Sequence, residues 1–489
     1  MRDSLRFYID GRWVEPHNPD RFEVINPASE EPAGIINLGD ASDVDDAVRA
    51  ARAAFRSFSR SSRKERIELF ESVIAAYRPR RKELGEAIME EMGAPAKIAE
   101  GLHAMVGQLH LKTALEVLKT YPFEERRGTT WVVHEPIGVC ALITPWNWPI
   151  NQVAAKVAPA LACGCTVVLK PSEYSPFSAR IWTEIMAEGG VPAGVFNMIQ
   201  GSGPAVGAAL SAHPDVDMVS FTGSTRAGIE VARNAAPTIK RVHQELGGKS
   251  ANIVLPDADI AEAVAAGVHA MAHNSGQSCN APTRMLVPAE RMAEAIVAAR
   301  TAAGHLRIGD PAADPDLGPV VNRIQFDRIQ TLIETGIAEG ATLVAGGPGR
   351  PEGLAKGFYV RPTVFADVRN DMTIAREEIF GPVLTIIPYK TVDEAIQIAN
   401  DSPFGLAAYV QGRDPRLIAE VASLLRVGQV LINQPQPDPM APFGGYKQSG
   451  NGREWGDHGF EGFLETKALL GHPDIDLGHL AQKRLPEPA

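Results

Sequence analysis

The sequence predicts an α/β protein whose parallel sheets are buried on both faces. Short runs of apolar and β-branched residues lie at 139–143, 166–169, 195–199 and 218–222. Segments long enough for helices separate these runs, which is the pattern of repeated strand–helix–strand units. A second region of the same alternation begins after Gly247-Gly248 and runs to about residue 433. Because ligands bind at the carboxyl ends of such strands, the polar residues that follow each strand are the candidates for a functional site.

The region before these strands is predicted to be mainly helical from about residue 42. Ser42 and Asp45 have the spacing of a capping box, which satisfies free backbone N–H groups at a helix start. Val44 and Phe55 then belong to an apolar series that recurs on one helical face. Residues 63–120 continue the helical pattern.

Composition argues against nucleic acid as a partner. The chain of 489 residues carries 48 Lys and Arg against 59 Asp and Glu, a net charge of −11, whereas phosphate binding needs a basic surface. A short basic cluster at 78–82 is followed by Glu83 and Glu86 at helical spacing. We therefore interpret this cluster as a solvated helix face.

Neither a membrane anchor nor a disulfide framework is expected. The N-terminus has no apolar signal segment, and the uncharged stretch 137–155 is interrupted by prolines and amide side chains. The four cysteines lack the CxxC spacing of zinc or redox motifs, and no histidine cluster accompanies them. We therefore expect no metal site and a reducing, cytoplasmic setting.

The first two strands are each followed by polar residues suited to binding. Asn147 lies in a stiff loop rich in proline and tryptophan, where its side-chain N–H can hold an oxyanion or satisfy the loop backbone. Lys170 and Glu173 can bond to the hydroxyls of one ribose, or simply to each other. A carboxylate there would repel a 2′-phosphate, which favours NAD over NADP.

The fourth strand leads into a helix through Gly223 and Ser224. Backbone N–H groups at such a helix N-terminus can bind a pyrophosphate, although an ordinary serine cap has the same sequence. The segment lacks the lysine of a P-loop, which disfavours hydrolysis of nucleoside triphosphates. The glycines at 201–207 have the spacing GxGxxxG and are interpreted as a tight turn.

The most reactive candidate is Cys279. Small polar residues surround it, so core packing explains it poorly, and nearby backbone amides can lower its pKa and hold an oxyanion.

Glu245, beside two glycines, can move to activate water or can be an ion-paired surface residue. His273 leaves a thiol hydrolase open as an alternative. Glu378 and Phe380 can contact a second ribose and a nicotinamide, or merely end a helix.

Together these motifs resemble the aldehyde dehydrogenase superfamily over nearly the whole chain. In family order they are Pro145-Trp146-Asn147, Lys170-Pro171-Ser172-Glu173, residues 221–228, residues 245–249, Gly276-Gln277-Ser278-Cys279 and residues 378–382. The spacing between Glu245 and Cys279 also matches the family. Six motifs in the same order favour the functional interpretation of each one over its structural alternative.

The resemblance implies a role for each catalytic candidate. Cys279 is the nucleophile that forms a thiohemiacetal and then a thioester, and Asn147 with the Cys279 backbone N–H holds the oxyanion. Glu245 activates the water that hydrolyses the thioester, which indicates release of free acid rather than transfer to coenzyme A. Lys156 and Glu454 correspond to a proton relay.

The resemblance also implies a cofactor site and a substrate tunnel. The cofactor is NAD, with NADP as the other option, and the substrate is a small-molecule aldehyde whose identity the resemblance leaves open. The cofactor residues are Ile143, Trp146, Lys170, Glu173, Gly223, Ser224, Glu378 and Phe380. The tunnel residues are Trp148, Ala155, Ser278, Asn280 and Phe443. Ala155 stands where many relatives carry a bulky aromatic residue, so a wider tunnel is expected.

The architecture implied is a Rossmann-like cofactor domain plus a second α/β catalytic domain and a small bridging β element for oligomerisation. The ranges are 1–117 and 137–246 for the split cofactor domain, 247–448 for the catalytic domain, and 118–136 with 463–489 for the bridge. Exposed strand edges usually pair with another subunit, so a homodimer or homotetramer is expected. Besides the thiol hydrolase, a non-catalytic structural or binding member of the same fold is an alternative, against which the intact Cys279, Asn147 and Glu245 argue.

Overall fold

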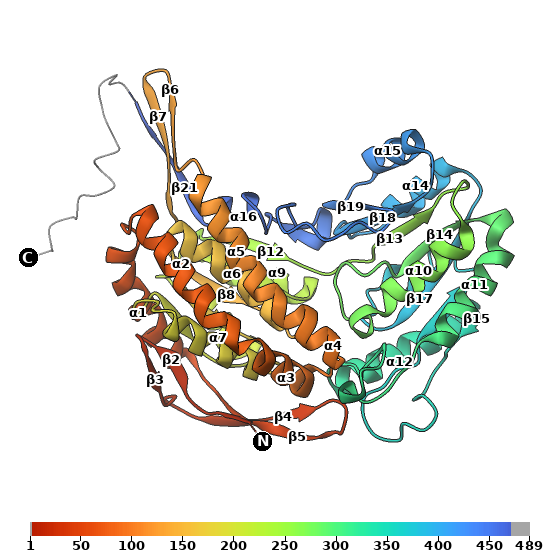
Figure 1. Ribbon diagram of the computed structural model, residues 1–489, viewed down its shortest axis with the longest axis horizontal. Helices are drawn as coiled ribbons and strands as arrows, with labels where there is room; N and C mark the ends of the chain where they lie inside the picture. The colour runs from red at the N-terminus through yellow and green to blue at the C-terminus, as the bar shows by residue number, and fades with distance from the viewer. Residues whose placement is uncertain (1, 471–489) are drawn as a thin grey trace, which may run out of the picture.

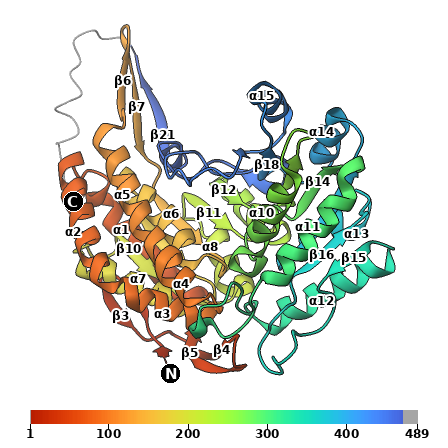
Figure 2. The same ribbon diagram turned by 45° about the vertical axis from the view of Figure 1, so that its right-hand side comes forward.

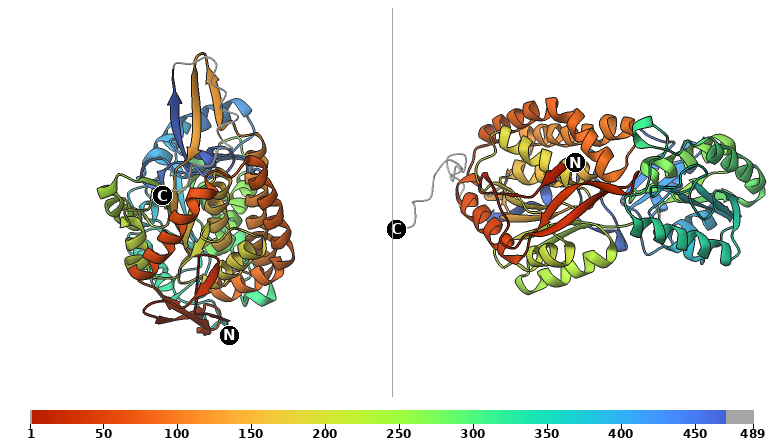
Figure 3. Two further views of the ribbon diagram at one scale, coloured as in Figure 1. Left: turned by 90° about the vertical axis from the view of Figure 1, so that its left-hand side faces the viewer. Right: turned by 90° about the horizontal axis from the view of Figure 1, so that it is seen from below.

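A computed structural model describes residues 2–470 and arranges them in two α/β lobes and a projecting β arm (Figure 1). The first lobe contains the red to yellow segments, and the second contains the green to light-blue segments. The same division is visible after a turn of the molecule (Figure 2) and from below (Figure 3). Within the described range, no helix combines the length and the apolar character needed to cross a membrane.

The first lobe is built on an eight-stranded sheet in the order β20-β12-β11-β8-β9-β10-β2-β3. Its central strands, from β12 to β10, all pair in parallel. The strands are β2 (Phe7–Ile9), β3 (Arg12–Val14), β8 (Val139–Ile143), β9 (Thr166–Lys170), β10 (Phe196–Met198), β11 (Met218–Thr222), β12 (Arg241–Glu245) and β20 (Gly450–Asn451). The four strands predicted from apolar runs are therefore confirmed, with small differences at their ends.

Helices cover both faces of this sheet, which explains the continuous apolar runs. In β8, Cys140 and Leu142 pack into one core cluster, whereas Val139, Ala141 and Ile143 pack into another. Helices α2, α3, α5, α6 and α7 contribute to the first cluster, and α1, α8 and α9 to the second. The helices are α1 (Ala41–Phe58), α2 (Arg63–Tyr77), α3 (Arg81–Met92), α4 (Ala96–Ile98), α5 (Ala104–Thr120), α6 (Pro149–Cys163), α7 (Pro176–Glu188), α8 (Ala208–Ala212) and α9 (Thr225–Ala235). Short 3-10 or π segments are η1 (Arg78–Arg80), η2 (Ala99–His103), η3 (Gly203–Gly207) and η4 (Ala236–Thr238).

The start of α1 differs from the predicted capping box of Ser42 and Asp45. The box is formed instead by Asp40, whose side chain accepts from the Ser42 N–H at 2.8 Å, and Asp43, whose carboxylate accepts from the Asp40 N–H at 3.0 Å. Aspartate caps helices as well as serine does, so the same motif fits the sequence two residues earlier.

The second lobe is built on a seven-stranded sheet in the order β15-β16-β17-β14-β13-β18-β19. All its pairs are parallel except β15 with β16. The strands are β13 (Ala251–Val254), β14 (Arg284–Pro288), β15 (Thr342–Ala345), β16 (Thr363–Ala366), β17 (Val383–Tyr389), β18 (Ala407–Gln411) and β19 (Gln429–Ile432). The helices are α10 (Ile260–Ala272), α11 (Met292–His305), α12 (Arg323–Ala338), α13 (Thr373–Arg376), α14 (Val392–Asn400) and α15 (Pro415–Leu424). Short 3-10 segments are η5 (His273–Gly276), η6 (Ala289–Arg291), η7 (Pro311–Ala313) and η8 (Lys447–Ser449).

Two small sheets complete the fold. One joins β1 (Arg2–Ser4), β5 (Glu31–Leu38) and β4 (Asp20–Asn26), and the other is the arm of β21 (Leu464–Leu469), β7 (Thr130–Pro136) and β6 (Glu124–Arg127). The arm projects away from the body (Figure 1, Figure 3). The short helix α16 (His458–Glu461) precedes its last strand, β21, near the end of the described chain. The β structure expected for the bridging element at 118–136 and 463–489 is thus present at 124–127, 130–136 and 464–469, while 471–489 lie outside the described residues.

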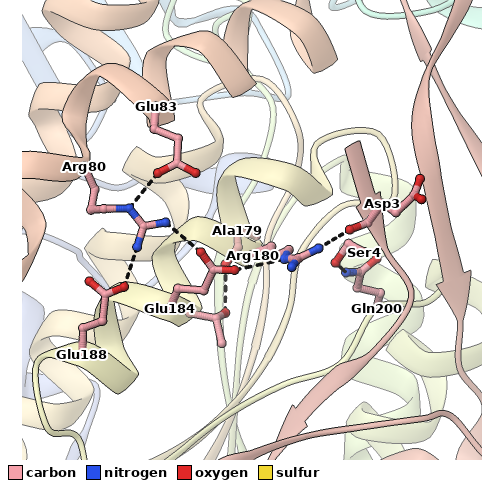
Figure 4. A network of polar contacts seen from close by, with 10 residues as sticks. Asp3, Ser4, Arg80, Glu83, Ala179, Arg180, Glu184, Glu188 and Gln200 are labelled. Carbon is pink, nitrogen blue, oxygen red and sulfur yellow. Dashed lines mark hydrogen bonds and ion pairs between the residues drawn. The ribbon is translucent and has the colours of Figure 1, made fainter. Parts of the chain in front are cut away.

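The basic cluster at 78–82 is only partly the solvated face that we expected. The guanidinium of Arg80 contacts the carboxylates of Glu83, Glu184 and Glu188, each at 2.7 Å (Figure 4). Its side chain is 19% exposed. Arg180 extends the network because it binds Glu184 and the backbone oxygen of Asp3. Only tertiary packing brings α7 to this arginine, so helical spacing could not reveal the contact.

Replacing Arg80 with alanine is expected to lower the free energy of unfolding by about 1–3 kcal/mol, because three carboxylates lose their shared partner. The measurement is urea unfolding at low and high salt. Arg291→Ala is the matched control, since its pair with Glu294 is local to one helix and more exposed. Equal losses in the two variants would contradict a stabilising role for the Arg80 network.

Candidate active site

The loop that carries Cys279 has an unusual backbone. It follows α10, and Asn274 and Ser275 have φ angles of 54° and 56°, in the left-handed region. Gly276 follows at φ 73°, and a Cβ atom there would lie 2.2 Å from the backbone of Gly381. Glycine is therefore required at 276. This tight winding fixes the position of the thiol, and such strain is typical of functional loops.

Asn147 is hydrogen-bonded to the loop that carries Cys279, here called the thiol loop, both as a donor and as an acceptor. Its side-chain Nδ2 donates to the Gln277 backbone oxygen at 3.0 Å, and Asn274 Nδ2 donates to the Asn147 backbone oxygen at 2.9 Å. Asn147 is only 3% exposed. The loop after β8 and the loop after α10 thus lock together, and the amide of Asn147 is held against the segment that carries Cys279.

The environment of Cys279 raises the pKa of its thiol. Burial is the largest cause, the carboxylates of Glu378 and Glu245 add to it, and a backbone hydrogen bond opposes it. A backbone hydrogen bond does lower this pKa, as predicted, but burial first and then the two carboxylates outweigh it, so the net shift is upward. The resting side chain is a neutral thiol, so nucleophilic attack requires that its proton be removed.

Glu245 ends β12 and is buried, which excludes the surface ion pair considered from sequence. Its Oε1 lies 3.3 Å from His243 Nε2, and its Oε2 is buried with no hydrogen-bond partner among the described residues. Burial raises the pKa of Glu245 well above its usual value, and the nearby Glu454 raises it further. A carboxyl group of raised pKa is suited to exchange protons near neutral pH.

Lys156 and Glu454 form a buried ion pair beside Glu245. Lys156 Nζ lies 2.5 Å from Glu454 Oε1 and donates to Ser220 Oγ at 3.0 Å. Their exposed fractions are 0% and 5%. Burial would raise the pKa of Glu454, but Lys156 lowers it overall. The two proposed relay residues, far apart in sequence, therefore meet in one charged pair.

Several predicted cofactor residues lie at the carboxyl ends of neighbouring strands. Ile143 and Lys170 end β8 and β9, and Gly223 and Ser224 follow β11. Lys170 Nζ binds Glu173 Oε2 at 3.2 Å, while Ser224 caps α9 by accepting from the Ala227 N–H at 3.3 Å. A buried lysine, a partly exposed carboxylate and a helix N-terminus are polar groups that a dinucleotide can bind.

The other cofactor residues approach from the second lobe. Glu378 Oε1 accepts from the Gly248 N–H at 2.9 Å, and a Cβ on Gly247 would lie 2.3 Å from Glu378 Oε2. Burial raises the pKa of Glu378 to about 7. Phe380 has a φ of 60°, and its ring meets that of Trp146 edge-on at 5.5 Å. Residues of both lobes therefore meet at Trp146 and at Gly247-Gly248.

The predicted tunnel residues fall into separate groups. Trp148 Nε1 donates to Ser278 Oγ at 2.8 Å, and Tyr409 donates to the Asn280 backbone oxygen at 3.0 Å. Phe443 pairs with Glu454 through backbone hydrogen bonds and stacks on Trp455. Ala155 is buried in α6, and no hydrogen bond or ring contact within residues 2–470 joins it to the others.

Two histidines flank Trp148: His273, which sequence analysis considered as a partner of the thiol, and His103, which it did not connect with the site. His103 stacks on the Trp148 ring at 4.0 Å, and His273 stacks on it at 5.7 Å. His103 also contacts Asn274 Oδ1 at 3.1 Å, which supports the thiol loop. His273 therefore belongs to an aromatic stack. The sequence offers one weak signal for His103: it is a histidine in a mostly apolar helical stretch.

A comparison with protein-family models matches residues 13–469 to the Aldehyde dehydrogenase family. The chain belongs to this family. Aldehyde dehydrogenases are also its relatives by full-length similarity. The 3-succinoylsemialdehyde-pyridine dehydrogenase of a Pseudomonas species is 56% identical, over 96% of this chain and 99% of that protein.

Solved aldehyde dehydrogenases have the same fold. Aldehyde dehydrogenase C of Pseudomonas syringae, solved as a mutant with NAD+ and octanal, is 54% identical with a TM-score of 0.95, over 97% of this chain and 98% of that one. The Mycobacterium tuberculosis enzyme, solved with NAD+, is 41% identical with a TM-score of 0.93, over 97% and 99% of the two chains. These comparisons support neither a thiol hydrolase nor a non-catalytic protein.

Proposed function

We propose that this protein oxidises an aldehyde to the carboxylic acid with NAD+, through a thioester on Cys279. One observation carries the proposal: the Asn147 amide is bonded to the loop of Cys279. An oxyanion donor beside a nucleophile, with a buried carboxyl group in the same site, is the set that this reaction requires. Membership of the aldehyde dehydrogenase family supports it.

Each residue then has a defined step. Once the Cys279 thiol has lost its proton to solvent, Sγ adds to the carbonyl carbon, and the Asn147 Nδ2–H and the Cys279 backbone N–H hold the negative oxygen of the thiohemiacetal. Bound NAD+ supplies the hydride acceptor. Glu245 takes a proton from water as the water oxygen adds to the thioester, and the carbon–sulfur bond breaks. The Lys156–Glu454 pair carries the proton away from Glu245.

The cofactor site proposed here favours NAD+ over NADP+. Lys170 and Glu173 would bind the adenosine ribose, and the Glu173 carboxylate would repel a 2′-phosphate. Gly223 and Ser224 would hold the pyrophosphate at the start of α9. Glu378 would bind the second ribose. Ile143, Trp146 and Phe380 would pack against the bases of the dinucleotide.

The substrate tunnel would run past Trp148, Ser278 and Asn280 to Phe443. The small side chain of Ala155 leaves α6 without the bulk that would narrow this path. We therefore propose a medium-sized aldehyde as substrate, and the octanal bound to the Pseudomonas syringae enzyme supports this. Hydrolysis by Glu245 makes the free acid the product.

The proposed domains are residues 1–117 with 137–246, 247–448, and 118–136 with 463–489. The exposed edges of the arm would pair with a second subunit in a homodimer or homotetramer, because free strand edges favour such pairing. We also propose a cytoplasmic location, because the four cysteines are free and three are buried, as in proteins that keep their thiols reduced.

The test is to offer NAD+ or NADP+ with aldehydes that include octanal and to follow absorbance of the reduced cofactor. We expect reduction with NAD+ to exceed that with NADP+, and the organic product to be the free acid. No reduction with any aldehyde would overturn the proposal. Acyl-CoA formed on addition of coenzyme A would overturn the hydrolytic step.

Asn147→Ala is expected to lower kcat/KM by roughly a hundredfold, because losing one oxyanion donor costs about 2.7–4 kcal/mol of barrier. NAD+ affinity, measured by calorimetry, should stay unchanged. The control is Asn18→Ala, which removes an exposed amide bound to Asp40, far along the chain from the thiol loop. Unchanged turnover in Asn147→Ala would remove this side chain from the mechanism.

A further inference from the structure

His243 is a buried histidine that the proposed reaction does not yet use. It lies on β12 two residues before Glu245, so the two side chains point to the same face of the strand. Its Nε2 lies 3.3 Å from Glu245 Oε1, and the two residues are 4% and 2% exposed. Glu245 Oε2 has no hydrogen-bond partner in the part of the chain that the structure describes. The imidazole is thus the side-chain contact that orients this carboxyl group.

Two glycines on neighbouring segments pack closely against His243 and Glu245. A Cβ atom on Gly452 would lie 2.5 Å from His243 Cδ2, and one on Gly444 would lie 2.7 Å from Glu245 Oε1. Larger residues at either position would displace the ring or the carboxyl group. The close approach therefore holds His243 and Glu245 in one arrangement.

The charge state of His243 suits it to donate a hydrogen bond. Burial lowers the pKa of His243 to about 4, with Lys156 and Arg453 lowering it and Glu454 raising it. These three, with Glu245, are the charged groups around the ring. At neutral pH the imidazole is uncharged and carries one proton. When that proton is on Nε2, the ring donates it to a carboxylate oxygen of Glu245.

We propose that His243 is a positioning residue for Glu245: its Nε2–H holds Oε1, favours the ionised carboxylate and leaves Oε2 to accept the proton of the hydrolytic water. The inference rests on the proposed function and concerns its second step, the hydrolysis of the thioester. Hydrogen bonds to a charged acceptor are stronger than those to a neutral one, so the contact stabilises the carboxylate more than the acid.

The hydrolytic step balances without a change in His243. The water oxygen forms a bond to the thioester carbon, and one water proton moves to Glu245 Oε2. The carbon–sulfur bond breaks, and its electron pair stays on the sulfur of Cys279. His243 neither gains nor loses a proton, which distinguishes it from the Lys156–Glu454 pair.

The test separates formation of the thioester from its hydrolysis. His243→Phe keeps a ring without an N–H, His243→Leu is a second variant without a donor, and His243→Gln retains a side-chain N–H. For each, the burst of reduced cofactor reports acylation, and the single-turnover rate of acid release reports hydrolysis across a range of pH. The holoenzyme with octanal and NAD+ is used throughout.

Losing the donor raises the pKa of Glu245, and hydrolysis needs the ionised form, so the rising limb of the hydrolysis profile moves to higher pH. We expect a shift of about one to two pH units in His243→Phe and His243→Leu, and hydrolysis roughly ten to a hundred times slower at neutral pH. The burst is unchanged, and His243→Gln recovers most of the shift. A merely structural defect would instead lower both steps at every pH.

His458→Leu is the matched control, because His458 contacts Glu461 at 3.1 Å in an exposed pair. Its profile should match that of the wild type. The inference is overturned if the donor-free variants keep the wild-type profile, if they lose burst and hydrolysis equally at every pH, or if His243→Gln restores nothing. A wild type that reduces no cofactor would overturn the proposed function itself, and the inference with it.

Discussion

Replacing Cys279 with alanine is expected to abolish aldehyde-dependent reduction of NAD+. A hydrated or free aldehyde gives up hydride poorly, whereas the thiohemiacetal places negative charge on the oxygen that drives hydride departure. Without sulfur no such adduct forms, and the Asn147 amide has no oxyanion to stabilise. Initial rates of cofactor reduction should therefore fall to the level of the enzyme-free reaction.

Cys163→Ala is the control for this change. Cys163 is buried at the end of α6, where its thiol approaches the backbone oxygen of Phe460, and it has no place in the proposed reaction. The variant should keep its activity. NAD+ binding to Cys279→Ala, measured by calorimetry, should show that the cofactor site is intact. Residual aldehyde oxidation in that variant would refute covalent catalysis at this position.

Replacing Glu245 with glutamine is expected to stop the reaction after its first half. The amide cannot take a proton from water, and general-base catalysis contributes roughly 10²–10⁴-fold to such a step. One equivalent of reduced cofactor should appear per active site, and steady-state turnover should then fall by roughly that factor. Intact-mass spectrometry should detect an acyl group, which peptide mapping assigns to Cys279.

In the wild-type enzyme, the rate of thioester hydrolysis is expected to depend on pH. The pKa of Glu245 is raised, so the fraction in the ionised form grows as pH rises toward and through that value. Hydrolysis should accelerate with pH over this range, and in Glu245→Gln the dependence should disappear. Unimpaired turnover in Glu245→Gln would assign the base to another group.

Sequence patterns predict those parts of the fold that depend on local composition. The strands at 139–143 and 218–222 are confirmed because each is a short run rich in apolar and β-branched residues that is buried on both sides. The start of α1 was misplaced because Asp40 and Ser42 are equally good caps, and only the backbone conformation distinguishes them.

The electrostatics of the site could not be predicted in the same way. The pKa of Cys279 is raised by burial and then by Glu378 and Glu245, which come from other strands and loops. His103 stacks against Trp148 across a long sequence separation, and His243 matters because it shares a face of β12 with Glu245. Motifs indicate which side chains carry chemistry, whereas their charge states follow from three-dimensional neighbours.

The short strand β20 has a consequence for how the protein is made. It completes the sheet beside β12, and Glu454 just beyond it neutralises the wholly buried Lys156. A lysine deprived of its partner in that interior would be costly, so we expect the first lobe to pack stably around Lys156 only once Glu454 is present. During synthesis on the ribosome, residue 454 emerges long after the other strands of this lobe. We therefore expect the surroundings of Glu245 to form late in folding.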